Sequence, residues 1–304
     1  MARLISLVED AHPALPEVMA ALAPHGGHAH VIGLTGSPGV GKSTTTAALI
    51  SALRAQGKRI AVLAVDPSSP FSGGALLGDR IRMEHHATDP DVFIRSVASR
   101  GHLGGLSFAT PQALRVLDAA GFDVVLLETV GVGQSEVEVA GRADTVVVIV
   151  APGMGDGIQA AKAGILEIGD VFVVNKADRD GADDTVRDLR HMIQLGNRER
   201  SVDWRTPVVR TVASRGDGIR ELVESLAAHR RWLEESGTLD ARRSRRARSE
   251  IEAIALAELR RRMGGEDGGL VPDDVASAVA SGTTDVYAAA SLVVERLTQE
   301  PGRQ

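Results

Sequence analysis

Short apolar runs alternate with stretches of helical periodicity between residue 30 and about residue 217. The apolar runs are rich in β-branched residues and are mostly continuous, which is typical of parallel strands covered on both faces. We expect strands at His30–Thr35, Ile60–Val65, Val92–Val97, Val124–Glu128, Thr145–Val150, Val171–Asn175 and Val208–Val212. We expect helices between them at Lys42–Gln56, Pro111–Ala119, Ile158–Ile168 and Asp183–Gln194. This alternation predicts an α/β fold with a mostly parallel central sheet and flanking helices.

The two ends of the chain follow a different pattern. The first 29 residues contain two short helical stretches, Leu4–Asp10 and Glu17–Leu22, and then a loop. After about residue 218 the strand-like runs stop, and only helical patterns follow. These are expected at Gly218–Glu235, Asp240–Met263, Pro272–Val279 and Thr284–Leu297. The sequence therefore predicts a helical N-terminal segment (1–29), an α/β domain (30–217) and a helical C-terminal extension (218–304).

Composition excludes several classes of protein. The 304 residues include no cysteine, so disulfides and thiolate chemistry are excluded. No apolar run approaches the roughly 18–20 residues that cross a bilayer, and Glu9 and Asp10 interrupt the N-terminus, unlike in a secretory signal. The net charge of −6 gives no general attraction for nucleic acid. We expect a cytoplasmic protein that binds neither membrane nor nucleic acid.

A glycine-rich motif joins the first predicted strand to the first long helix. GSPGVGKS matches the pattern G-x-x-x-x-G-K-[ST] in the strand–helix context that a phosphate-binding loop requires. Backbone N–H groups of such a loop bind phosphate oxygens, the lysine reaches the β/γ-phosphates, and the serine hydroxyl ligates Mg²⁺. The expected nucleotide-binding residues are Gly36, Ser37, Pro38, Gly39, Val40, Gly41, Lys42, Ser43 and Thr44.

A second motif selects the base. NKAD (175–178) ends the strand VFVVNKAD, and the Asp178 carboxylate there would accept hydrogen bonds from N1–H and the N2 amino group of guanine. Adenine lacks that donor pair and would leave the carboxylate unpaired, so the motif favours GTP. Asn175 would brace the loop and face N7, and the Lys176 stem would lie on the purine. In TVASRGDG, the backbone N–H of Ala213 is the candidate contact to guanine O6.

Carboxylates at strand ends are the candidate metal-side groups. Asp66 ends the second strand, Asp79 follows it, and Glu128 ends the strand DVVLLETVGVG. Together with Ser43 they would hold Mg²⁺, directly or through water. Gly131 would contact the γ-phosphate through its N–H. No glutamine follows this glycine as in Ras-like GTPases, and slow intrinsic hydrolysis is therefore expected. Gln134, Gln159 or a partner's arginine are the alternatives for positioning the attacking water.

Five segments together resemble the MeaB/ArgK-type GTPases of the SIMIBI branch of P-loop proteins. They are GSPGVGKS, VDPSSPFSGGALLGDRIRM, ETVGVGQSE, APGMGDGIQAAKAGILEIGD and VNKAD. The resemblance implies a homodimeric chaperone of methylmalonyl-CoA mutase that uses GTP to gate delivery of adenosylcobalamin, with the C-terminal extension as dimerisation arm. It implies metal-side roles for Asp66 and Glu128, a switch position for Asp79, and a further switch at 152–162. Asp156 and the catalytic Lys162 match that switch, whereas Gly157 stands where an acidic residue is common.

Three alternatives remain at this stage. A metallochaperone GTPase is disfavoured by the missing cysteines and the weak spacing of His25, His28 and His30. An ATP-dependent small-molecule kinase conflicts with NKAD. A scaffold with a purely structural nucleotide conflicts with the intact Lys42, Ser43 and Glu128. We expect GTP or GDP with Mg²⁺ and no permanently bound organic cofactor. The arginine run at 242–248 is expected to be solvated or dimer-facing, and the two tryptophans to be packing residues.

Overall fold

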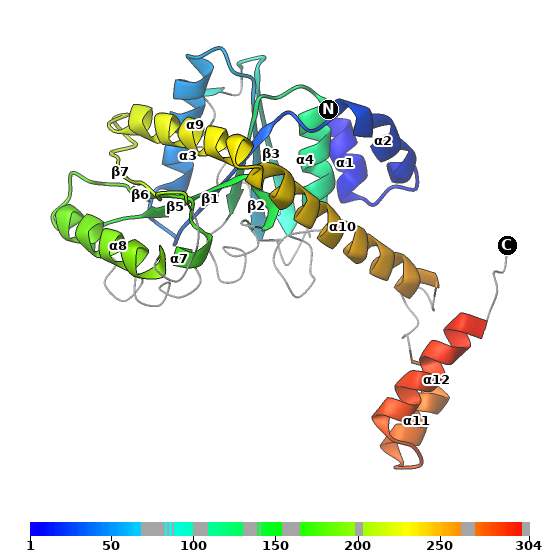
Figure 1. Cartoon of the computed structure of the whole chain (residues 1–304). Coiled ribbons are helices and arrows are strands. Elements are labelled where there is room, and N and C mark those ends of the chain that lie inside the picture. The colour runs from blue at the N-terminus through cyan, green and yellow to red at the C-terminus, as the bar shows by residue number, and fades with distance from the viewer. Residues whose placement is uncertain are drawn as a thin grey trace. The chain divides into compact units, whose positions relative to one another are not determined.

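The computed structural model describes residues 1–67, 83, 85–86, 88–99, 109–129, 139, 141–153, 165–197, 203–262 and 271–299 (Figure 1). The chain divides into two compact units, Met1–Arg243 and Ser244–Gln304. The first contains the whole sheet and the helices that cover it. The regular elements described in the second are all helices.

A seven-stranded sheet forms the centre of the first unit, in the order β3-β2-β4-β1-β5-β6-β7. Every neighbouring pair is parallel, so the predicted parallel α/β fold is confirmed. The strands are β1 (His30–Thr35), β2 (Ile60–Pro67), β3 (Val92–Ser99), β4 (Val124–Thr129), β5 (Thr145–Val150), β6 (Val171–Val174) and β7 (Val208–Arg210). Each lies within three residues of its expected bounds. β4 and β5 flank β1, so the carboxyl ends of these three strands lie side by side at one edge of the sheet.

Helices cover both faces of the sheet and bury a separate apolar cluster on each. The buried residues of one cluster come from the strands and from α1 (Ala2–Glu9), α4 (Ala109–Ala119) and α8 (Ala182–Asn197). The other joins them to α3 (Lys42–Arg54) and α9 (Ile219–Glu235). Alternate residues of each strand serve the two clusters, which explains why the strands are continuously apolar. Most of the helix expected at 158–168 lies outside the described residues, and α7 (Ile165–Ile168) is its visible end.

The N-terminal segment packs on α4. It contains α1, α2 (Leu15–Leu22) and a 3-10 turn at Ala23–His25. The Asp118 carboxylate on α4 accepts hydrogen bonds from the backbone N–H groups of Gly27, His28 and Ala29. Because three donors converge on one carboxylate, the entry into β1 is held in place.

Two buried aspartates hold the start of α10 (Thr238–Arg262). Arg242 binds the Asp170 carboxylate through both Nη atoms, at 2.9 and 2.8 Å. Arg243 Nη2 lies 3.1 Å from Oδ2 of Asp144, which is fully buried immediately before β5. The expectation that the arginine run is solvated or dimer-facing is therefore wrong for these two residues, because they form intramolecular ion pairs with the sheet.

A histidine pair lies beside these ion pairs. The Thr145 hydroxyl lies 2.7 Å from His30 Nε2 and 2.8 Å from His229 Nδ1. Burial lowers the pKa of His30 to about 3 and that of His229 to about 4, although Asp144 and Asp170 respectively act against it. Trp204 and Trp232 pack against His229, with ring centroids 4.7 and 5.6 Å away, which confirms the tryptophans as packing residues.

The second unit contains the remainder of α10, α11 (Asp273–Ala280) and α12 (Val286–Gln299). α11 and α12 pack through a small cluster of Val275, Val279, Ala289 and Val293. Several large apolar side chains of this unit are exposed. They are Ile251, Ile254, Leu256, Leu259, Val271, Val286, Tyr287, Leu292 and Val294. In the described part of the chain, no helix has the length and apolar character needed to cross a membrane.

Candidate nucleotide-binding site

The phosphate loop lies between β1 and α3, at the carboxyl edge of the sheet where β4, β5 and β6 also end. Parallel α/β sheets bind ligands at this edge. The elements therefore bring together three of the predicted groups: the loop from Gly36 to Ser43, Glu128 at the end of β4, and Asn175 after β6.

Two glycines of the loop are required by close backbone approach. Gly36 has φ +141°, and a Cβ there would lie 2.1 Å from the carbonyl oxygen of Ile149. Gly41 has φ +96°, and a Cβ there would lie 2.4 Å from Asn175 Nδ2. Gly39 is also left-handed, at φ +81°, but a Cβ there would meet nothing within 4 Å. Sterics thus fix the loop against β5 and the NKAD loop, while Gly39 supplies only backbone conformation.

Lys42 folds back over the loop that carries it. Its Nζ donates to the carbonyl oxygens of Gly36, at 2.7 Å, and Ser37, at 3.2 Å. The side chain is only 8% exposed. The ammonium therefore already lies against the loop that would bind the phosphate oxygens.

The predicted metal-side groups Ser43 and Glu128 are in direct contact. Ser43 Oγ donates to Glu128 Oε1 at 2.8 Å, and Thr46 Oγ1 donates to Glu128 Oε2 at 2.8 Å. Glu128 is 2% exposed. A buried carboxylate next to a serine hydroxyl fits Mg²⁺, which prefers oxygen ligands and takes few of them from the protein. Within the described ranges no cluster of three or more His, Cys, Asp or Glu side chains is found.

Several predicted site residues lie outside the part of the chain that the structure describes. Asp79, Gly131 and Lys162 fall in undescribed segments. Asp66 is placed only by its backbone, opposite Ala98 near the end of β2. Their assigned roles remain predictions.

Asn175 joins the phosphate loop to the base-recognition loops. Its Nδ2 donates to the Val40 carbonyl oxygen at 2.8 Å. Its Oδ1 accepts from Thr211 Oγ1 and from the backbone N–H of Ala213, both at 3.1 Å. The side chain is 3% exposed. These bonds brace the loop, as expected of Asn175, while its contact with guanine N7 remains a prediction. The N–H of Ala213, expected to face guanine O6, donates to Asn175 Oδ1 in this structure.

Lys176 and Asp178 lie at the open side of the same loop. Lys176 has φ +57°, unusual for a residue other than glycine, and its Nζ donates to the Gly39 carbonyl oxygen at 2.6 Å. Asp178 is 41% exposed and lies 3.4 Å from Arg215 Nη1. The carboxylate predicted to recognise the base is thus accessible, with a cation beside it.

Sequence reasoning missed three contributors to this site: Thr46, Thr211 and Arg215. Thr46 lies three residues after Ser43 in α3, so both side chains are on one face of the helix. This spacing could have identified Thr46 from the sequence. Thr211 and Arg215 bracket the Ala213 position, but a single sequence does not show which of their atoms face Asn175 and Asp178.

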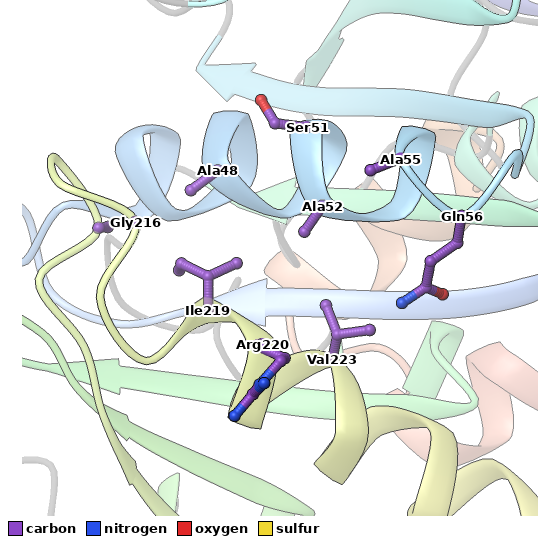
Figure 2. A pocket seen from close by; sticks show the side chains of 10 residues that line it. Ala48, Ser51, Ala52, Ala55, Gln56, Gly216, Ile219, Arg220 and Val223 are labelled. Carbon is purple, nitrogen blue, oxygen red and sulfur yellow. The ribbon is translucent and has the colours of Figure 1, made fainter.

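A groove of about 630 Å³ lies beside the site, between α3 and α9 (Figure 2). Ala48, Ala52 and Ala55 line it on one side, and Ile219, Arg220 and Val223 on the other. Ala213 and Gly216 close the end nearest the base-recognition turn, and no residue of the phosphate loop lines it. The groove therefore does not include the phosphate loop, but it shares Ala213 with the predicted base-binding part of the site.

Comparison with known proteins places this geometry among GTPases. The family model described as methylmalonyl Co-A mutase-associated GTPase MeaB matches residues 1–267. A protein of Pyrococcus horikoshii whose name assigns it to the GTPases is 46% identical, over 98% of this chain and 93% of its own length. The mouse mitochondrial protein named methylmalonic aciduria type A homolog is 40% identical over 70% of this chain, which spans 52% of that protein.

A solved structure shares the fold over nearly the whole chain. The crystal structure of a LAO/AO transport system kinase superimposes with a TM-score of 0.72 and 29% identity, covering 98% of this chain and 92% of that one.

Proposed function

The chain belongs to the MeaB family of methylmalonyl-CoA mutase-associated GTPases, and on that premise we propose that it is a Mg²⁺-dependent GTP hydrolase that acts as a chaperone of an adenosylcobalamin-dependent acyl-CoA mutase. GTP turnover would gate delivery of the mutase cofactor. The observation that carries the nucleotide part is the Asn175 side chain of NKAD, which bonds Val40 of the phosphate loop on one side and the segment after β7, at Thr211 and Ala213, on the other. A ligand that has both a base and phosphates would contact both of the segments that Asn175 joins.

The residues would divide the work of binding as follows. Backbone N–H groups of the loop and the start of α3 would bind the phosphates. Lys42 would exchange the Gly36 and Ser37 carbonyl oxygens for β/γ-phosphate oxygens. Asp178 would accept the N1–H and N2–H of guanine.

Ser43 and Glu128 would hold Mg²⁺ on the γ-phosphate side, with Ser43 as ligand and Glu128 directly or through water. The metal would neutralise charge on the transferred phosphoryl group. Glu128 would keep the Ser43 hydroxyl oriented, and Thr46 would keep the carboxylate oriented. The sequence ETVGV has no glutamine after the glycine, so we propose slow turnover by the chain alone.

The mutase is proposed from the family, whose description names methylmalonyl-CoA mutase. The mouse relative, named for methylmalonic aciduria, is consistent with that partner. We propose that the chain acts in the cytoplasm and as a homodimer. The exposed apolar side chains of α10 and α12 support an association of two copies, because association would remove their apolar surface from water.

Nucleotide choice is tested by hydrolysis of GTP and ATP by the purified chain, with Mg²⁺ and with chelator. The proposal predicts Mg²⁺-dependent GTP turnover, little ATP turnover, and loss of guanine preference in Asp178→Ala. The matched control is Asp180→Ala, an exposed aspartate two residues away. ATP turnover equal to GTP turnover would instead favour the ATP-dependent kinase.

A further inference from the structure

The turn that follows β7 is built tightly. The backbone N–H of Val212 donates to the carbonyl oxygen of Asp217 at 3.0 Å, and the two residues form an antiparallel bridge. Gly216 and Gly218 have φ +79° and +74°, and a Cβ at Gly218 would lie 1.9 Å from the Arg210 carbonyl oxygen. The backbone from Val212 to Gly218 is therefore constrained.

Arg215, within this turn, connects two carboxylates. Its Nε lies 2.9 Å from Asp217 Oδ2, within the same turn. Its Nη1 lies 3.4 Å from Asp178 Oδ2, on the NKAD loop. The shorter contact ties the guanidinium to its own turn, and the longer one reaches the carboxylate that would read the base.

The orientation of the Asp178 carboxylate matters for guanine in particular. Guanine offers two parallel donors, N1–H and the N2 amino group, so both carboxylate oxygens must lie in the plane of the base. A base with N1–H alone accepts a carboxylate in many rotations. Asp178 is 41% exposed, and an exposed side chain left to itself populates several rotamers. A fixed cation at one oxygen restricts them.

We infer that Arg215 is a positioning residue for guanine specificity, which holds the Asp178 carboxylate in the rotation that accepts both guanine donors and is itself held by Asp217. This role rests on the proposed binding of guanine nucleotides. It goes beyond that proposal because it assigns discrimination between guanine and bases lacking the 2-amino group to a residue outside NKAD.

The test compares the Kd values of GDP and inosine diphosphate, which lacks the 2-amino group, for the full chain and its variants. Exposed ion pairs are weak, so Arg215→Ala should lower the preference for GDP over inosine diphosphate about three- to fivefold. Asp217→Ala should lower it by a similar factor, because it releases the anchor. The double variant should lose little more than either single variant, since both act through one contact chain.

Arg220→Ala is the matched control. Arg220 is an exposed arginine on the adjacent α9 and is 3.7 Å from Glu224. It should leave both Kd values unchanged. An unchanged ratio in Arg215→Ala, or equal weakening of both nucleotides, overturns the inference while leaving the GTPase proposal intact. Failure of the unaltered chain to bind GDP overturns the GTPase proposal itself.

Discussion

Ser43 and Glu128 lie 85 residues apart in sequence, yet Ser43 Oγ donates a 2.8 Å hydrogen bond to Glu128 Oε1. The contact joins the start of α3 to the end of β4. β4 is paired with β1 in the sheet. Because β1 leads directly into the phosphate loop, the parallel register of this pair brings hydroxyl and carboxylate together. The oxygen atoms expected on the metal side are therefore assembled by the fold itself.

Glu128→Gln should reduce Mg²⁺-dependent GTP hydrolysis about 10- to 100-fold and shift the required Mg²⁺ concentration upward. The amide keeps the volume but loses the negative charge and presents a donor to a hydroxyl donor. A Mg²⁺ titration of turnover measures both effects. Glu221→Gln, on the exposed first turn of α9, should match the unaltered chain. Identical Mg²⁺ titrations for Glu128→Gln and the unaltered chain would refute the metal-side role.

Gly36→Ala should destabilise the fold by at least about 2 kcal/mol, because the new Cβ would overlap the Ile149 carbonyl oxygen and the residue would remain at positive φ. Gly39→Ala is the matched variant, since its Cβ would meet no atom within 4 Å. It should cost about 1 kcal/mol, the penalty for a left-handed non-glycine residue. Urea unfolding measures both. Equal losses of unfolding free energy in the two variants would show that the positive φ of Gly36, and not its close contact with β5, is the reason that glycine is needed there.

Arg242→Ala should lower the free energy of unfolding by about 2–3 kcal/mol. The change leaves the Asp170 carboxylate, which is 7% exposed, without its bidentate partner. The figure lies below the 3–5 kcal/mol typical of a fully buried pair because the Arg242 side chain is 30% exposed. Arg245→Ala, three residues along the same helix and exposed, should change stability by less than about 0.5 kcal/mol. Similar losses from both variants would contradict the assignment of the ion pair.

Stability should fall as pH drops from about 6.5 toward 4, because burial lowers the pKa of His229 to about 4 while the unfolded chain protonates near 6.5. The unfolded state then binds more protons than the native state, so the free energy of unfolding decreases with falling pH. Each buried histidine contributes up to about 1.4 kcal/mol per pH unit in this window. His229→Gln should flatten the slope between pH 6.5 and 5, whereas His191→Gln, at an exposed position, should not. An unchanged slope in His229→Gln would show that other groups cause it.

The strand positions and the phosphate loop were predictable because each rests on a local pattern. Continuous β-branched runs identify parallel strands, and the loop motif is defined by the backbone conformations and side chains of consecutive residues. Strand ends were less predictable. Asn175 was expected inside β6, but its backbone follows the strand, and its side chain is used as a bridge between loops.

Contacts between distant segments were not predictable from one sequence. The arginine run has the composition of a solvated face, but Arg242 and Arg243 reach two aspartates that precede strands of the sheet. Nothing local distinguishes them from Arg245 or Arg248. The contact of His30 was equally unpredictable, because its partner Thr145 is 115 residues away. Such pairings follow from strand order, which the hydrophobic pattern alone does not give.

The most direct test of the proposed function is the rate of GTP hydrolysis by the full chain, measured alone and with methylmalonyl-CoA mutase, under single-turnover conditions with Mg²⁺. Slow hydrolysis by the chain alone and clear acceleration by the mutase are predicted, with no acceleration in Glu128→Gln. GTP hydrolysis that the mutase leaves unchanged would contradict the proposed chaperone role and leave a GTPase with another partner.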